Sequence, residues 1–277
     1  MAQNAKAAAP AKKQGFGGVK DAWIILVICC ILAYSFYFFV LGDPSHFQGG
    51  DPSGHPMPGD LMGTVYKGGF VVGLILTLLL TVIVLGVERF FGIKSASGKM
   101  NLAKFTSQVK AAVKAQNFDE AKALCDKMQG SVANVVLASI NMYQTVEKDS
   151  SLKKAAKIAK IQQAHEEATQ LEMPTLQMNM PMVATIVSLG TLTALFGTVL
   201  GMISSFQALS AGGGGDSMEL SAGISEALVN TASGILTSWV ATVVYNFFSN
   251  KIDKLTYALD EIGFTIAATY DSNHNEA

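Results

Sequence analysis

Charged residues are scarce in this 277-residue sequence. They make up 15% of it, and a single arginine, Arg89, is present. Soluble domains carry about 25% charged residues. Half of the residues are hydrophobic, and the mean hydropathy is positive. This composition argues against a soluble globular protein and indicates a chain with long segments in lipid.

Cysteine is also rare, and the three that occur form no framework. Cys29 and Cys30 are adjacent, so they cannot bridge each other without severe strain, and Cys125 lies among lysines and acids. No C-x-x-C pair and no histidine-rich tract is found. We therefore predict reduced thiols that pack in the interior.

No motif predicts an enzyme active site, a cofactor site or a metal site. The glycine run at 212–215 lacks the strand before it and the helix after it that a phosphate-binding loop needs, so a flexible turn is expected. His46 and His55 lie in a segment rich in Gly, Pro and Asp, where nothing holds them on a rigid element. A surface pair is a simpler interpretation than metal ligands. We predict no catalytic residue, no cofactor and no metal.

Four stretches are long enough to cross a bilayer, which takes about 20 apolar residues. We expect transmembrane helices at 22–41, 66–88, 182–206 and 224–249, of which the fourth carries only Glu226 near its start. Buried helices of a soluble protein would be the alternative, but uncharged runs of this length favour a membrane. A cleaved signal peptide is a second alternative for the first stretch. Its apolar run exceeds the usual 7–15 residues and ends in bulky aromatic residues, which disfavours cleavage.

The basic residues alternate between the connecting segments. Four lysines precede the first stretch, thirteen basic residues lie in 89–181, and two lysines follow the fourth stretch, whereas 42–65 and 207–223 have none. Cytoplasmic loops are the ones enriched in Lys and Arg. We therefore predict a multi-pass protein with both termini cytoplasmic. The predicted soluble segments are a cytoplasmic tail at 1–21, a periplasmic loop at 42–65, a cytoplasmic domain at 89–181, a periplasmic loop at 207–223 and a cytoplasmic tail at 250–277.

The segment 89–181 is predicted to be helical throughout, which makes the fold all-α, with long helices extending from the membrane into this domain. Phe105, Val109 and Val113 recur at helical spacing, and Asn117 begins a turn and restart. A helix from about residue 151 runs towards the third span, where Pro174 and Pro181 should interrupt it. The lysines of this helix have no interleaved aromatic residues, so we expect contact with membrane lipid or water and no nucleic acid.

Polar side chains form stripes along the last two spans. In the third, they recur at spacings of three and seven, and in the fourth at spacings of seven. The stripe residues are Ser188, Thr191, Thr198 and Ser205, and then Thr231, Ser238 and Tyr245. Gly197 and Gly201 form a G-x-x-x-G step that lets helices approach closely, and Gly234 lies beside the second stripe. The hydroxyl groups either pack helices together or line a wet lumen, and spacing alone leaves both open.

Three motifs resemble the MotA/TolQ/ExbB proton-channel family, nearest ExbB. They are LFGTVLGM at 195–202, GISEALVNTA at 223–232 and the pair Tyr245–Asn246, in consecutive spans with a short loop between. The similarity extends over about 66–257. It implies a homopentamer in the inner membrane of a Gram-negative bacterium, enclosing a dimer of an ExbD-like single-span partner whose aspartate titrates. Proton flow would then act on a TonB-like protein for outer-membrane transport.

The resemblance also implies roles for particular residues. Thr198 and Thr231 match the family's functional threonines, and Glu226 matches its glutamate. A span precedes the family's three, Thr191 stands where proline is common, and the proline usual in the last span is replaced around Ser238. A TolQ-like envelope-maintenance subunit and a non-conducting scaffold remain alternatives, as does Na⁺ in place of H⁺. A transporter acting alone is disfavoured because the spans have no midplane charge.

Overall fold

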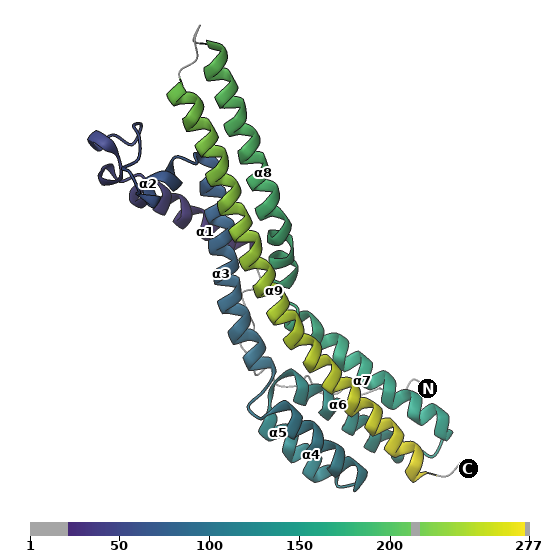
Figure 1. Cartoon of the computed structure of the whole chain (residues 1–277). Helices are drawn as coiled ribbons and strands as arrows, with labels where there is room; N and C mark the ends of the chain where they lie inside the picture. Colours follow the sequence, from purple (N-terminus) through teal and green to yellow (C-terminus); the bar gives the residue numbers. More distant parts are fainter. Residues whose placement is uncertain (1–21, 212–216, 275–277) are drawn as a thin grey trace. The chain divides into compact units, whose positions relative to one another are not determined.

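The computed structural model describes residues 22–211 and 217–274, and that part of the chain is built from helices, with one isolated bridge between Phe47 and Pro56 (Figure 1). The all-α prediction is confirmed. The predicted tail at 1–21 and the turn at 212–215 lie outside the described residues. The helices are α1 (Ala22–Phe36), its π-helical continuation η1 (Tyr37–Leu41), η2 (Pro44–His46), η3 (Gln48–Gly50), α2 (Leu61–Tyr66), α3 (Phe70–Ala96), α4 (Leu102–Lys114), α5 (Phe118–Met128), α6 (Gly130–Glu147), α7 (Lys154–Leu176), α8 (Met180–Ala211) and α9 (Ser217–Asn273).

Four helices in the described residues are long and apolar enough to cross a membrane: Ala22–Leu41, Phe70–Ala96, Met180–Ser210 and Glu219–Asn273. Each overlaps one of the four predicted stretches, although Glu219–Asn273 extends well beyond the predicted 224–249, and the protein is an all-α polytopic membrane protein. The second helix begins at Phe70, although the predicted stretch started at 66. Tyr66 closes α2, and Gly69 then has a φ of +73°, a conformation that glycine adopts readily and that ends one helix before the next begins.

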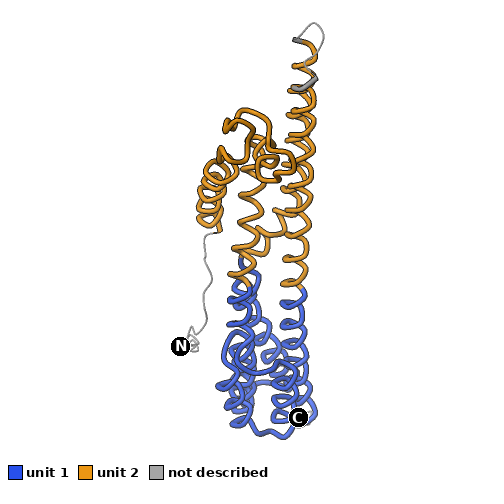
Figure 2. Tube along the Cα trace, turned by 60° about the vertical axis from the view of Figure 1, so that its left-hand side comes forward, with its two compact units in different colours: residues 1–18, 90–178, 250–277 blue, residues 19–89, 179–249 orange. Residues whose placement is uncertain are grey.

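The chain divides into two compact units (Figure 2). Unit 2 comprises residues 19–89 and 179–249, and it contains α1, α3, α8 and the first part of α9. Ile25 and Cys29 of α1 pack with Leu85 of α3 and Val183 of α8. A second cluster joins Val82, Ile186 and Ala241 from α3, α8 and α9. Apolar side chains on these buried faces hold α1, α3, α8 and α9 together.

Two tyrosines attach the end of the first span to the end of α2 and the start of α3. The hydroxyl of Tyr34 donates a hydrogen bond to the carbonyl of Phe70 at 3.2 Å, and that of Tyr37 donates to the carbonyl of Tyr66 at 2.9 Å. The Tyr37 and Tyr66 rings also stack, with centroids 4.7 Å apart. Aromatic rings with a bonded hydroxyl suit a membrane interface, where one end is apolar and the other polar.

Unit 1 comprises residues 1–18, 90–178 and 250–277, and its described part holds α4 to α7 and the end of α9. Phe105, Val109 and Val113, which the sequence places on one face of a helix, are fully buried. Asn117 caps α5 by accepting a hydrogen bond from the backbone of Glu120, at the restart that the sequence predicts. Residues 250–273, predicted only as part of a tail, continue α9.

The predicted interruption between α7 and α8 occurs, but not at the prolines. Pro174 lies inside α7 without ending it, and Pro181 lies in the first turn of α8, where proline is well tolerated. The break falls at Gln177, which caps α7, and Asn179, whose φ is +62°. Asparagine is among the few non-glycine residues that adopt this left-handed conformation readily.

Candidate functional site between helices α8 and α9

Helices α8 and α9 approach each other through glycine. A Cβ atom on Gly201 would lie 2.8 Å from the carbonyl oxygen of Gly223 and 2.9 Å from the backbone nitrogen of Ala227. One on Gly197 would lie 2.7 Å from Cγ of Asn230, and one on Gly234 would lie 2.6 Å from the carbonyl oxygen of Gly190. These distances are too short for real contacts, so a larger residue at these positions would push the helices apart.

The two threonines singled out by the sequence meet between the helices. Oγ1 of Thr198 lies 2.5 Å from Oγ1 of Thr231, and either hydroxyl can be the donor. Each oxygen also lies close to a carbonyl one turn earlier in its own helix, Ala194 at 2.9 Å for Thr198 and Ala227 at 3.0 Å for Thr231. Both side chains are half-buried. The pair therefore joins the two stripes directly.

A second hydroxyl pair lies two helical turns away. Oγ1 of Thr191 is 2.9 Å from Oγ of Ser238. Since 191 and 198 are seven residues apart, as are 231 and 238, the antiparallel helices bring the stripes into register. Ser205, seven residues further along α8, is buried, and its hydroxyl donates to the carbonyls of Gly201 and Leu220 at 2.9 Å and 3.4 Å.

The remaining stripe residues lie apart from these pairs. Ser188 is exposed on α8. Tyr245 packs against the cluster formed by Ile25, Cys29, Leu85 and Val183. The spacing of the stripes is visible in the sequence, whereas the pairing of one helix with the other follows from the register of α8 against α9.

Glu226 is placed against α3. A Cβ atom on Gly69 would lie 2.5 Å from Oε1 of Glu226, so the carboxylate rests against the backbone just before α3 begins at Phe70. A carboxylate near a helix N-terminus is favoured by the partial positive charge there. The sequence placed Glu226 near the start of the fourth span and gave no neighbour for it. The contact between Glu226 and Gly69 joins residues far apart in the chain, so no local sequence pattern predicts it.

Two polar features were missed as site elements. Asn230 is fully buried, and neither its amide nitrogen nor its amide oxygen has a hydrogen-bond partner in the described residues. At the end of α3, buried Arg89 bonds both carboxylate oxygens of Glu88, and the amide of Asn179 donates to the same carboxylate at 3.2 Å. A Glu-Arg pair at the end of an apolar span, with the chain's single arginine, was the available signal.

One of the two histidines near the first span, His46, has a structural role. Nδ1 of His46 lies 2.8 Å from Oδ2 of Asp60, and Asp60 caps α2 by accepting hydrogen bonds from the backbones of Met62 and Gly63. The bond from Gly63 and that from His46 lower the pKa of Asp60. His55 is exposed. Within residues 22–211 and 217–274, no group of three or more His, Cys, Asp or Glu could hold a metal ion.

The hydroxyl pairs fall inside a segment that matches a known family. Residues 131–261 match the model of the MotA/TolQ/ExbB proton channel family, which confirms the resemblance found in the sequence. The ExbB-like 3 biopolymer transport protein of Synechocystis is 30% identical over 115 residues, 41% of this chain and 55% of the relative. TolQ of Haemophilus influenzae is 33% identical over 84 residues, 30% of this chain and 37% of the relative. The Synechocystis ExbB-like 1 protein is 44% identical over 64 residues, 22% of this chain and 25% of the relative. The matches thus span from a quarter to just over half of the relatives' lengths.

Proposed function

We propose that this chain, whose residues 131–261 match the model of the MotA/TolQ/ExbB proton channel family, is a proton-conducting stator subunit that works with a single-span partner. The observation that carries the proposal is the pair of hydroxyl contacts, Thr198 with Thr231 and Thr191 with Ser238, in the matched segment. They form a polar track two turns long in the contact between α8 and α9, helices whose apolar spans carry almost no ionisable side chain.

The track can relay protons but cannot store them. A hydroxyl donates one hydrogen bond and accepts two, so Thr198 and Thr231 can exchange the roles of donor and acceptor. Helix α8 contains no Asp, Glu, Lys, Arg or His, and between residues 220 and 250 helix α9 contains only Glu226. One charge crossing 100 mV is worth about 2.3 kcal/mol, and coupling it to work requires a group that titrates within the field. An ExbD-like partner, as a dimer, would supply that group as an aspartate.

We propose assembly into a homo-oligomer, which the apolar surface of α8 and α9 supports. Large apolar side chains on these helices are exposed in the single chain, among them Phe196 at 54% and Trp239 at 65%. Lipid or other copies of the chain would cover them. By analogy with the family we propose a homopentamer around the partner.

The distribution of lysine supports the orientation. Unit 1 holds nearly all the basic residues and would be cytoplasmic, as would both termini, while 42–65 and 207–223 would be periplasmic. The protein would lie in the inner membrane of a Gram-negative bacterium. Membrane lipid would contact its apolar helices.

The names of the relatives bear on which system would receive the energy. Two of the compared relatives are named ExbB-like and one is named TolQ. We favour a TonB-like protein as the recipient of the energy and TolQ-like envelope maintenance as the alternative. Deleting the coding sequence separates them: lost energy-dependent uptake with an intact envelope supports the first, whereas detergent sensitivity with normal uptake supports the second.

Replacing threonine with valine tests the proton track. Valine nearly keeps the shape of threonine and removes the hydroxyl, so Thr198→Val and Thr231→Val should each abolish proton flux in proteoliposomes that contain the partner. Native mass spectrometry should show the oligomer unchanged. Thr242→Val is the matched control, because in the described part of the chain the Thr242 hydroxyl bonds the carbonyl of Ser238 in its own helix, at 2.7 Å, and no other group. If the three variants conduct alike, the hydroxyl pairs are packing surface and the channel function is rejected.

A further inference from the structure

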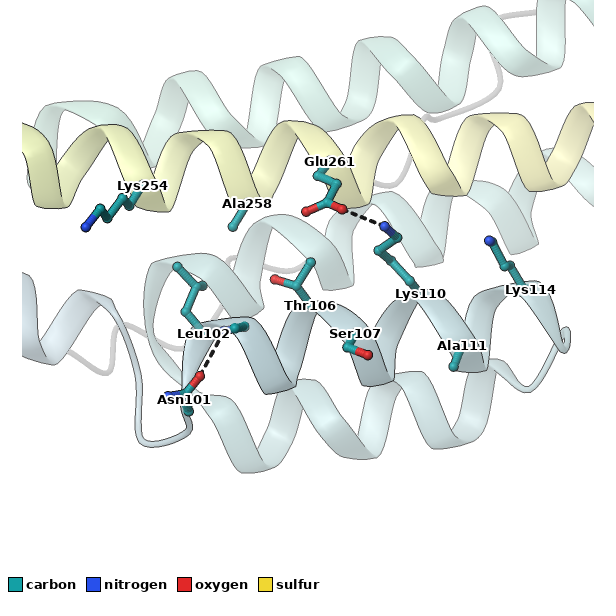
Figure 3. Close-up of a pocket in the computed structure, with 11 residues that line it drawn as sticks. Asn101, Leu102, Thr106, Ser107, Lys110, Ala111, Lys114, Lys254, Ala258 and Glu261 are labelled. Carbon is teal, nitrogen blue, oxygen red and sulfur yellow. Dashed lines mark hydrogen bonds and ion pairs between the residues drawn. The ribbon is translucent and has the colours of Figure 1, made fainter.

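Unit 1 contains an open groove between α4 and α9, with a volume of about 770 Å³ (Figure 3). Its polar lining comes from one side of each helix: Asn101, Thr106, Ser107, Lys110 and Lys114 on or beside α4, and Lys254 and Glu261 on α9. Pockets for small ligands have volumes of about 300–1,000 Å³. The groove is therefore large enough for a small molecule.

The charge in the groove is positive. Nζ of Lys110 lies 2.6 Å from Oε1 of Glu261, so this lysine is neutralised within the chain. Glu261 is the one acid that lines the groove, whereas Lys114 and Lys254 also line it and form no ion pair within residues 22–211 and 217–274. Two ammonium groups thus remain for an anion.

Thr106 adds an unused hydroxyl to these charges. Its side chain is only 6% exposed, and Oγ1 has no hydrogen-bond partner in the described residues. Other threonines of unit 1 bond the carbonyl one turn earlier, as Thr256 does to Ile252 and Thr265 to Glu261. Figure 3 shows Thr106 on the side of α4 that faces α9. A buried polar group without a partner is destabilising, and a ligand oxygen that accepts from the Thr106 hydroxyl would remove this cost.

We propose that this groove binds a soluble polyphosphate anion. Ammonium and hydroxyl groups are donors that phosphate oxygens accept. The lining from Asn101 to Lys114 follows 13 residues of α4, about 20 Å of helix. That length exceeds a single lipid headgroup and suits several linked phosphates. No aromatic residue lines the groove, so it offers no surface on which a nucleobase would stack. Residues 1–20 of the chain carry four lysines and no acid, so they do not complement it.

Calorimetric titration of the full-length protein in nanodiscs of neutral lipid tests this, with sodium tripolyphosphate as the probe. We expect saturable binding of one tripolyphosphate per chain. The double variant Lys114→Gln/Lys254→Gln should weaken it at least about tenfold, because each charged hydrogen bond is worth about 1.5–3 kcal/mol. The matched control, Lys104→Gln/Lys127→Gln, removes the same charge from exposed positions outside the groove and should change affinity less than twofold. Equal losses in both double variants would overturn the proposal in favour of general attraction.

The variant Thr106→Val tests whether the Thr106 hydroxyl binds the ligand or is only an unsatisfied buried group. The variant should melt at a higher temperature without ligand, because the orphan hydroxyl is gone, and should bind tripolyphosphate several-fold more weakly. Unchanged binding would overturn the site.

Two further probes decide the source of the anion. Binding that is absent in neutral nanodiscs and gained only with phosphatidylglycerol would reject a soluble ligand, and hexaglutamate that binds as tightly as tripolyphosphate would identify an acidic peptide instead. These measurements need no proton flux, so they stand or fall independently of the channel function.

Discussion

The two units bury and expose different kinds of side chain. In unit 1, large apolar residues such as Phe105, Ile140 and Leu259 fill the interior, and the lysines and acids lie outside this core. In unit 2, α8 and α9 meet through glycines and hydroxyls, while Phe196 and Trp239 point outward. Helices in the two units are therefore stabilised in different ways. Water makes burial of apolar area the main stabilising force in unit 1, whereas lipid removes that force and leaves close backbone contact and polar pairs in unit 2.

The largest effect should come from breaking the buried ion pair of unit 2. Arg89→Met leaves the carboxylate of Glu88 buried without its main partner, which typically costs about 3–5 kcal/mol of unfolding free energy. The double variant Glu88→Leu/Arg89→Met should recover most of it. In unit 1, Glu261→Gln removes a partly exposed pair with Lys110 and should cost at most about 1 kcal/mol. Unfolding in a detergent–SDS titration, followed by circular dichroism, measures all three, and similar costs for Arg89→Met and Glu261→Gln would contradict the comparison.

The glycine contact comes next. Gly201→Ala forces a methyl group against the backbone of Gly223 and Ala227, and we expect a loss of about 1–3 kcal/mol together with a weaker oligomer. Gly86→Ala is the control, since its methyl group would meet only the side chain of Val244, whose two γ-carbons lie at 3.3 Å and 3.9 Å. The same titration and native mass spectrometry apply. Equal stability of the two variants would show that a methyl group at Gly201 fits between α8 and α9.

Buried polar residues sharpen the contrast further. Asn230→Leu in unit 2 replaces an amide without partners by an apolar group of similar size, so unfolding free energy should stay constant or rise by about 1 kcal/mol. Ser139→Ala in unit 1 removes a buried hydroxyl that contacts Nδ1 of His165 at 2.9 Å and the carbonyl of Val135 at 3.0 Å, and should cost about 1 kcal/mol. A clear loss for Asn230→Leu would mean that the amide has a partner in the assembled protein.

The smallest effect is a pH dependence of unit 1. Burial lowers the pKa of His165, against a smaller opposite effect of Asp260 and Glu166, and the ring packs against Gly263. Below the ordinary histidine pKa of about 6.5, the unfolded chain takes up a proton more readily than the folded one, so stability falls as pH falls. Thermal melting between pH 7.5 and 5.5 should show this decline. It should flatten in His165→Gln and persist in His55→Gln, which alters an exposed histidine.

Much of the fold could be predicted from the sequence because lipid imposes length and polarity on each span. Runs without charge locate α1, α3, α8 and the start of α9, and helical spacing identifies the buried face of α4. The hydroxyl stripes are equally visible. Their pairing is not, since the register of α8 against α9 depends on glycine contacts distributed over both helices. The contact of Glu226 with Gly69 and the left-handed Asn179 also depend on tertiary structure.

Several hydroxyl groups in the spans point their protons back along their own helix. The hydroxyls of Thr77, Thr81, Thr237 and Thr242, like those of Ser205, donate to a carbonyl one turn back in their own helix. A hydroxyl has a single proton, so a hydroxyl bonded in this way presents lone pairs to its surroundings. Thr77, Thr81, Thr237 and Ser205 are buried, so their lone pairs face the interior of unit 2. A buried acceptor of this kind is satisfied by a hydrogen-bond donor and repels a carboxylate, so these positions favour donors among the side chains packed against them.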